Sequence, residues 1–480
     1  MTTFDLSKPY CKYFDEICKI PHGSFDEQRI SDYLVKFGKD HNLKTVQDDN
    51  LNVVIYKDAS IGYENSAPLL LQAHMDMVCE KNKDSNHDFK NDPLDLYVDG
   101  DWLKAKGTTL GADDGMGVAY ILAILDDDSL PHPALECCFT TKEEVGLLGA
   151  LKLDTSLFKA RRMVSLDGGG EVSTGISSAG GCMVIQTIPL DYKENKDTTY
   201  KLFVSGLLGG HSGGEIHKEK GNANKLAFRA IKEMLNKGLD FKFVSSDGGL
   251  KDNAIPRECE IIFASKSNFD DLNKSLEDSY HDFKQELEFS DNGIKVSLTK
   301  VDTSEKALDN FDSKRIVDYI FLLPNGFKHR SMAIEGLTLL SLNLGIVKTS
   351  GDYLVLTSSL RSALECGIDH LIDEIKTLAS LFNYKVSTSA RYPGWNYKAK
   401  SDMRTKLNKV MMEIYNKPLV EMATHGGCEC GVFASIDEDM DILTYGAICE
   451  DIHTPLERLD LNSFDRGYKV LTSLIKECKQ

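Results

Sequence analysis

The sequence has little positive charge for its length, no long apolar run and no C-x-x-C motif. Its 480 residues include 56 Lys and Arg against 74 Asp and Glu, which gives a net charge of −18. Nucleic acids and anionic membranes bind basic surfaces, so this balance argues against both as partners. The longest apolar stretch, 117–125, is about half of the roughly 18 residues needed to span a bilayer, so no transmembrane helix is predicted.

The twelve cysteines are scattered and include no C-x-x-C, so the sequence contains neither a zinc knuckle nor a thioredoxin-like motif. Residues 1–21 include Asp5, Lys8, Lys12 and Asp15, whereas a secretion signal needs an apolar core at this point. Both observations predict a protein of the reducing cytoplasm.

The pattern of apolar segments predicts an α/β protein with two domains, because 480 residues exceed one ordinary core. In the first third, helix-like segments alternate with short apolar strands, which is typical of a mixed sheet flanked by helices on both faces. A different series of strands and helices follows, and the first pattern then returns. We therefore predict a discontinuous domain, 1–182 and 394–480, and an inserted α+β domain, 183–393, with two lobes.

Two clusters of polar residues in the discontinuous domain are candidate ligands. His74 and Asp76 end a predicted strand, 69–77, in which residues two apart face the same side, so Asp76 can reach the His74 imidazole. Asp113 and Asp114 lie between glycines at a helix start, where the helix dipole favours negative charge. Taken alone, the first pattern favours a structural pair, and the second fits an acidic helix cap as well as a metal ligand.

Three further clusters follow predicted strands. Glu143 and Glu144 come after the strand 135–140, and adjacent carboxylates there repel each other unless a cation lies nearby. Asp167 follows a short apolar strand and precedes glycines, and His453 follows another strand near the end of the chain. Taken singly, the Glu143–Glu144 pair is explained equally well by an exposed acidic turn, whereas the Asp167 and His453 clusters more often have a structural role.

Together the clusters predict a two-metal site. Open α/β sheets bind their ligands at the carboxyl ends of strands, which is where four of the clusters lie. Two histidines with three or four carboxylates suit two divalent ions, with zinc as the first choice and cobalt or manganese as alternatives. A structural zinc site would be rich in thiolates, and this set of residues contains none.

Five motifs, HMDMV, GADDG, TKEEVG, LDGG and HTP, resemble in order and spacing the co-catalytic zinc peptidases of the carnosinase and bacterial dipeptidase superfamily. A second set resembles the cytosolic aminoacyl-histidine (Xaa-His) dipeptidase branch: GLLGGHSGGEIHKEKGNANK, NAIPRE, SSLRS, YPGW and HGGCECGVF. The resemblance spans nearly the whole chain. It implies that the discontinuous domain is a catalytic di-zinc domain and that the inserted domain is its lid.

The resemblance also implies a role for each candidate residue. The implied metal ligands are His74, Asp113, Glu144, Asp167 and His453. Asp113 would bridge the two ions and form a cis peptide with Asp114, Glu143 would be the general base, and Asp76 would hold His74. His74 and Asp167 would complete one metal site, and Glu144 and His453 would complete the other.

In the inserted domain, the resemblance implies that His211 reaches the scissile carbonyl and that Asn253, Arg361 and Gly427 bind the substrate. Arg361 suits a substrate carboxylate, because guanidinium binds this group in a bidentate manner. Closure of the lid would then complete the site. Without the resemblance, His211 could be an ordinary loop histidine, and Arg361 could form a salt bridge at a strand end.

These observations predict a metallo-dipeptidase that hydrolyses unblocked dipeptides, including Xaa-His dipeptides such as β-alanyl-histidine. One alternative is an N-acyl-amino-acid amidohydrolase that uses the same site. Another is a non-catalytic metal-binding protein, which the presence of Glu143 beside Glu144 disfavours. The expected partners are short peptides. A homodimer is compatible with the sequence, although a lid within one chain could close the site without a second copy.

Overall fold

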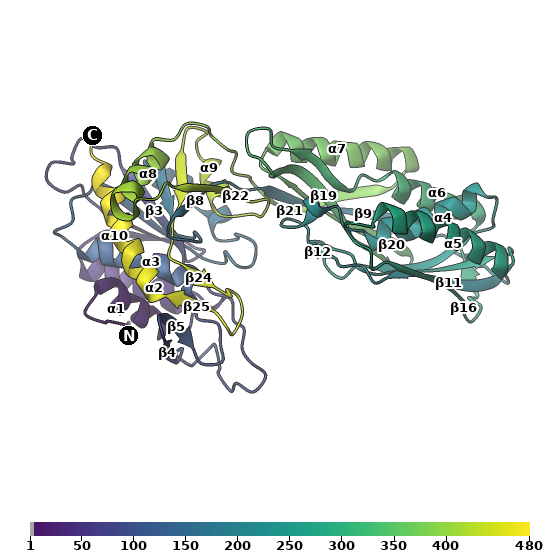
Figure 1. Cartoon of the computed structure of the whole chain (residues 1–480), viewed down its shortest axis with the longest axis horizontal. Coiled ribbons are helices and arrows are strands. Elements are labelled where there is room, and N and C mark those ends of the chain that lie inside the picture. The colour runs from purple at the N-terminus through teal and green to yellow at the C-terminus, as the bar shows by residue number, and fades with distance from the viewer. Residues whose placement is uncertain (1–3) are drawn as a thin grey trace. The chain divides into compact units, whose positions relative to one another are not determined.

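A computed structural model describes residues 4–480 of the chain (Figure 1). The chain divides into two compact units, which we call the discontinuous unit and the inserted unit. The discontinuous unit comprises the described part of Met1–Ser178 together with Trp395–Ala423 and Cys428–Gln480. The inserted unit comprises Ala179–Gly394 and Thr424–Gly427.

The discontinuous unit is built around a six-stranded mixed sheet. Its strands, in spatial order, are β1 (Lys44–Gln47), β2 (Val53–Lys57), β6 (Leu135–Thr140), β3 (Leu69–His74), β7 (Arg162–Ser165) and β23 (Asp441–Thr444). The central strand β3 runs parallel to β6 and β7, and β23 runs parallel to β7. The first two strands pair in the antiparallel sense. Every residue of β3 is buried, as its almost wholly apolar sequence requires.

Helices cover both faces of this sheet, because successive side chains of a strand point to opposite sides. In β2, Val53 and Ile55 belong to one buried cluster, and Val54 belongs to another. The first cluster also contains residues of α1 (Pro9–Cys18), α2 (Gln28–Asp40), α3 (Ala112–Asp126), α8 (Asp402–Tyr415) and α10 (Leu461–Glu477). The second contains residues of α9 (Cys430–Ala434). The predicted α/β class, a mixed sheet flanked by helices, is confirmed.

The apolar stretch 117–125 lies inside α3. All of its residues are buried, so the helix is apolar on every side because it is an internal element of the core. Within residues 4–480, no helix is long and apolar enough to cross a membrane.

Smaller sheets lie beside the main one in the discontinuous unit. One has four strands in the order β24 (Cys449–Glu450), β25 (Arg458–Asp460), β5 (Trp102–Ala105) and β4 (Leu96–Asp99). Another is a parallel pair of β8 (Ser173–Ser177) and β22 (Val420–Ala423). Pairing of β25 with β5 links the C-terminal segment to the segment that precedes α3.

The inserted unit contains one nine-stranded antiparallel sheet. Its strands are β16 (Lys295–Lys300), β11 (Thr198–Ser205), β15 (Cys259–Ser265), β13 (Lys242–Gly248), β19 (Thr338–Ser350), β20 (Tyr353–Ser362), β9 (Gly180–Pro189) and β21 (Lys385–Tyr392), with β18 (Gly326–Arg330) paired to β19. A single sheet thus runs through the region for which the sequence suggested two lobes. Short pairs join β10 (Lys193–Glu194) to β17 (Lys306–Ala307), and β12 (Gly210–His211) to β14 (Ala254–Ile255).

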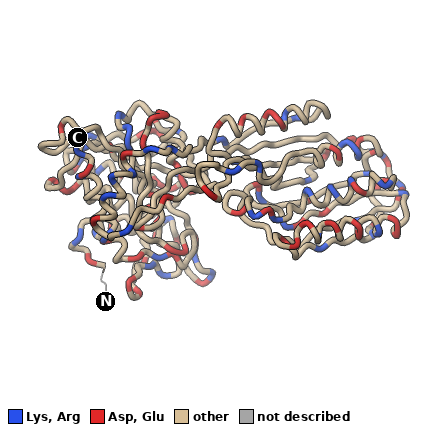
Figure 2. Tube along the Cα trace, turned by 45° about the horizontal axis from the view of Figure 1, so that its top comes forward, with Lys and Arg blue, Asp and Glu red and all other residues tan. Residues whose placement is uncertain are grey.

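Four helices supply the rest of the core of the inserted unit. They are α4 (Ala223–Asn236), α5 (Phe269–Glu286), α6 (Asn310–Leu322) and α7 (Glu365–Phe382). Acidic and basic residues are interspersed along both units (Figure 2). The excess of negative charge is therefore spread over the chain.

Candidate metal centre

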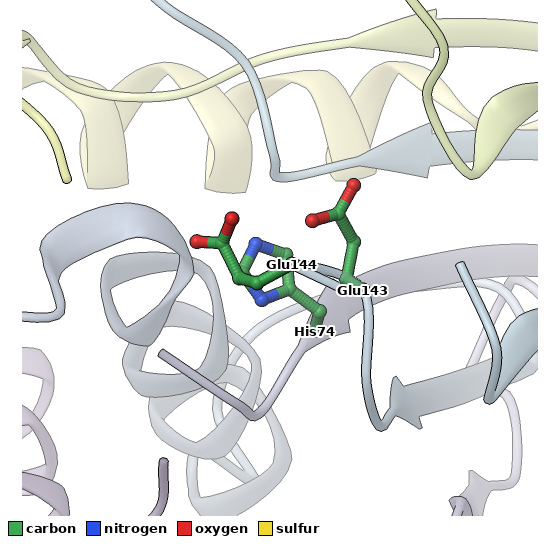
Figure 3. Close-up of side chains that lie close together, drawn as sticks. All are labelled: His74, Glu143 and Glu144. Atoms are coloured by element: carbon green, nitrogen blue, oxygen red, sulfur yellow. The ribbon is translucent and has the colours of Figure 1, made fainter. Parts of the chain in front are cut away.

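Three neighbouring parallel strands of the discontinuous unit end at the same edge of its sheet. β3 ends at His74, Glu143 and Glu144 follow β6, and Asp167 follows β7. Because β3 lies between the other two strands, their carboxyl ends converge. Figure 3 shows the carboxylates of Glu143 and Glu144 on the same side of the sheet as the His74 imidazole.

The start of α3 brings Asp113 to this edge. Gly111 has a φ of 67°, and a Cβ atom there would lie 3.0 Å from the sulfur of Met77, so both backbone and space favour glycine. Asp113 has non-helical backbone angles, and its peptide bond to Asp114 is cis. Its carboxylate lies 3.1 Å from Nε2 of His74 and accepts a hydrogen bond there.

The C-terminal segment completes the cluster with His453. Nε2 of His453 lies 3.0 Å from Oε1 of Glu144 and 3.3 Å from Oδ2 of Asp113. Three overlapping groups of side chains therefore have donor atoms within 4.8 Å of one another. These groups are His74–Asp113–Asp167, Asp113–Glu144–His453 and His74–Glu143–Glu144.

The electrostatics of this cluster fit divalent cations. Burial, together with the charge of Asp113, raises the pKa of Asp167 to about 7. Burial also raises the pKa of Glu143 well above its usual range. Hydrogen bonds to Asp113 and Glu144 raise the pKa of His453 to about 10. Crowded carboxylates that hold protons in this way bind a divalent cation in exchange for those protons.

Asp76 contacts His74 chiefly through its backbone. The strand ends at His74, before Asp76, and Nδ1 of His74 donates to the backbone carbonyl of Asp76 at 3.0 Å. The Asp76 carboxylate lies 3.7 Å from this nitrogen and accepts instead from Ser24 Oγ at 2.8 Å and from the Glu143 backbone N–H at 3.0 Å. Nε2 of His74 faces the Asp113 carboxylate and is the nitrogen that would bind a metal ion.

Two buried glutamates of this region were missed in the sequence. Oε2 of Glu429 accepts from Nε2 of Gln72 and from Oγ1 of Thr140, both at 2.6 Å, at the ends of β3 and β6. Burial raises the pKa of Glu429 to about 8. Glu457 accepts hydrogen bonds from the backbone around the start of α3. The available signals were an acidic residue inside the apolar HGGCECGVF segment and a glutamate four residues after His453.

The predicted substrate-binding residues gather around Ser212 and Tyr392 within the inserted unit. Arg361 donates from Nε to Ser212 Oγ at 3.4 Å and from Nη1 to the Tyr392 hydroxyl at 3.3 Å. The backbone carbonyl of Asn253 accepts from the Ser212 N–H at 2.8 Å. A Cβ atom at Gly427 would lie 2.7 Å from the Tyr392 ring, so this close approach requires glycine.

Arg361 is buried, with 7% of its surface exposed. Its hydrogen-bond partners are Ser212, Tyr392 and His211, and within residues 4–480 its guanidinium forms no ion pair with a carboxylate, so the salt bridge considered for it is not observed. Its Nη2 lies 3.5 Å from Nε2 of His211. A buried guanidinium without a carboxylate is costly unless a ligand supplies one.

The chain matches the model of Peptidase family M20/M25/M40 over residues 70–477, which contain the whole cluster. The chain belongs to this peptidase family. It is a metallopeptidase, and the family resemblance inferred from the motifs is confirmed.

Two comparisons extend this assignment along the whole chain. The cytosol non-specific dipeptidase of Escherichia coli (strain K12) is 34% identical over 98% of this chain and 97% of its own length. The crystal structure of an aminoacylhistidine dipeptidase from Vibrio alginolyticus matches this M20 peptidase with a TM-score of 0.91 and 32% identity, covering 98% and 96% of the two chains. Aminopeptidase PepT from Bacillus cereus shares the fold, with a TM-score of 0.58 and 14% identity over 99% and 100%.

Proposed function

We propose that this M20 peptidase is a dipeptidase that hydrolyses unblocked dipeptides, including Xaa-His dipeptides such as β-alanyl-histidine. The observation that carries the proposal is the pair of ligand groups that share Asp113, with the carboxylate of Glu143 at the same edge. The names of the relatives from Escherichia coli and Vibrio alginolyticus support the choice of substrate class.

We assign one divalent ion to His74, Asp113 and Asp167, and the other to Asp113, Glu144 and His453. Zinc suits these nitrogen and oxygen donors best, and cobalt or manganese would also be accepted. When bound, such ions would activate a water molecule and polarise the peptide carbonyl.

Glu143 is the proposed general base. It belongs to neither of the two assigned ligand groups, and its backbone N–H donates to Asp76, which holds the start of this turn. Burial raises its pKa, and a carboxylate that takes up a proton readily can remove one from water and deliver it to the leaving amine.

The proposed roles of His211 and Arg361 follow from the N–H groups that their side chains can donate to a substrate. Nδ1 of His211 accepts from the N–H groups of Gly213 and Gly214, at 3.2 and 3.1 Å, so the neutral ring carries its proton on Nε2. Burial lowers the pKa of His211, which favours this neutral form. The Nε2 proton of His211 and the Nη2 protons of Arg361 then face each other, an arrangement that an anionic acceptor would satisfy.

We assign Arg361 to the substrate C-terminal carboxylate and His211 to the developing oxyanion. Asn253 and Gly427 would contact the substrate beside them. Closure of the inserted unit as a lid stays part of this proposal, as does a cytoplasmic location. The twelve cysteines, none of which forms a disulfide, and the name of the Escherichia coli relative support that location.

The proposal is tested with Glu143→Gln and a substrate panel. We expect wild-type protein loaded with zinc to hydrolyse dipeptides with a free amine and to leave N-acetylated ones intact. Glu143→Gln should lower kcat by about 10²–10⁴ while binding two equivalents of metal, because the amide cannot accept the proton. Preference for N-acetylated substrates would instead identify an amidohydrolase. Bound metal without hydrolysis of any short peptide would identify a metal-binding protein.

A further inference from the structure

The buried carboxylate of Glu457 accepts hydrogen bonds from the backbone N–H groups of four consecutive residues at the start of α3. Its Oε2 accepts from Leu110 at 2.9 Å and from Gly111 at 3.2 Å. Its Oε1 accepts from Ala112 at 2.8 Å and from Asp113 at 3.5 Å. The first N–H groups of a helix have no partner within the helix, and they attract negative charge. Glu457 therefore holds the backbone that carries the Asp113 carboxylate.

Glu457 also ends the loop that carries His453. The Glu457 N–H donates to the carbonyl of Thr454 at 3.0 Å, and Oγ1 of Thr454 donates to the carbonyl of Asp451 at 2.7 Å. Residues 450–454 are exposed, whereas Glu457 is 3% exposed and lies directly before β25. The buried end of an exposed loop is thus bound to the segment that contains Asp113.

We infer that Glu457 is a positioning residue that sets the separation of Asp113 and His453, two side chains assigned to the same metal ion. This inference rests on the proposed two-metal site and deepens it. His453 belongs to only one of the two assigned ligand groups, whereas Asp113 belongs to both. Loss of the anchor should therefore weaken the ion held by Asp113, Glu144 and His453 more than the other ion.

The four contacts require a carboxylate rather than an amide. Each oxygen of Glu457 accepts from two backbone N–H groups. A glutamine has one acceptor oxygen, and its NH₂ group would point its donors at two of the backbone donors. Two buried backbone N–H groups would then have no hydrogen-bond acceptor, which lowers the free energy of unfolding substantially. Glu457→Gln is therefore a disruptive substitution, although it preserves the size of the side chain.

Glu136 offers a matched control in the same unit. It is a buried glutamate that accepts from the N–H groups of Lys159, at 3.0 Å, and Ala160, at 3.1 Å. It lies near the beginning of β6, at the opposite end of the strand from Glu143. Glu136→Gln should lower thermal stability through the same loss of backbone contacts without affecting metal binding. A merely structural role for Glu457 would give the same result as Glu136.

The experiment measures Co²⁺ binding to metal-free full-length protein by competition with a chelator and by the visible spectrum of the bound cobalt. We expect wild type and Glu136→Gln to bind two equivalents with the same spectrum. Glu457→Gln should keep one equivalent and bind the second about 10–100-fold more weakly, with an altered spectrum. Its kcat should fall while KM changes little, because the proposed substrate contacts lie elsewhere.

Two further outcomes separate this inference from the proposed function. If wild type fails to bind two equivalents, the two-metal site itself is wrong. If wild type binds two and Glu457→Gln binds both equally well, with only a lower Tm, the positioning role is overturned and the metal site stands. Should Glu457→Gln fail to fold, Glu457→Asp decides. Aspartate keeps the negative charge on a side chain that is shorter by one methylene. A loss of affinity for the second ion that is smaller than the loss expected for Glu457→Gln supports the positioning role, and unchanged affinity overturns it.

Discussion

Nε2 of His453 lies 3.0 Å from Oε1 of Glu144, although 309 positions separate the two residues in the sequence. The contact joins the turn after β6 to the C-terminal segment, which the chain reaches only after the whole inserted unit. His453 is also the most exposed member of the cluster, with 45% of its side chain accessible. It should therefore be the member whose removal disturbs the buried ligands least.

Replacement of His453 by alanine is expected to remove one metal ion and leave the other. His74, Asp113 and Asp167 form a ligand group that does not include this imidazole, so metal analysis after dialysis should give about one equivalent in the variant and two in wild type. Hydrolysis should fall with the loss of the second ion. His281→Ala, at an exposed position on α5, is the control and should keep both ions. Retention or loss of both ions in His453→Ala would contradict the assignment.

Replacement of Arg361 by methionine should abolish the preference for a free C-terminal carboxylate. Charge-assisted hydrogen bonds contribute about 1.5–3 kcal/mol, so kcat/KM for a free dipeptide should fall about 10–150-fold, mainly through KM. The same dipeptide with an amidated C-terminus should be hydrolysed equally by wild type and variant. Arg361→Lys should recover part of the loss, because lysine keeps the charge without the bidentate geometry. An equal loss on both substrates would assign Arg361 a structural role.

Glu429→Gln should stabilise the metal-free protein at neutral pH. The folded-state pKa of about 8 lies above the ordinary glutamate pKa of 4.5, so between these pH values the folded chain keeps a proton that the unfolded chain releases. The free energy of unfolding of wild type therefore falls as pH rises from 4.5 to 8, by on the order of 4 kcal/mol for a fully buried group. Glutamine cannot ionise, and its oxygen can still accept from Gln72 and Thr140.

Denaturant unfolding of metal-free wild type and Glu429→Gln at pH 5 and pH 8 measures this difference. The stability gap in favour of the variant should be small at pH 5 and wide at pH 8. Glu421→Gln, at an exposed position in β22, serves as the control and should track wild type. Parallel pH profiles for wild type and Glu429→Gln would show that Glu429 ionises normally in the folded protein.

Local sequence patterns predicted much of the fold, because strands and helices leave a periodic trace in hydrophobicity. The apolar strand that begins at Leu69, the helix that carries Asp113 and the strand before Glu143 all appear close to their expected places. The convergence of their ends followed from a general property of parallel sheets. This is why five scattered polar residues could be grouped into one candidate site.

Contacts between segments that are distant in the sequence could not be predicted, because they leave no periodic pattern in hydrophobicity. Glu457 is one acidic residue among 74, and only the folded chain shows that it binds the backbone of residues more than 340 positions away. Glu429 drew no prediction from the sequence, because its burial against Gln72 depends on how α9 packs. The end of β3 at His74 was missed for a related reason. The N–H groups of Met75 and Met77 bond to Thr140 and His22, and no propensity scale records that partnership.

The chain enters the inserted unit twice, at Ala179–Gly394 and again at Thr424–Gly427. A fragment that joined residue 178 directly to 395 would still carry His425, whose imidazole is buried against the hydroxyl of Ser341 at 2.7 Å. Two cuts therefore cannot separate the units cleanly. During synthesis, the first part of the inserted unit emerges before residues 428–480, which supply β23, α10 and His453. The inserted unit is therefore nearly complete while the discontinuous unit still lacks a strand, a helix and His453. A chain that stops within residues 428–452 should leave exposed the apolar core that α10 covers, as well as lacking His453.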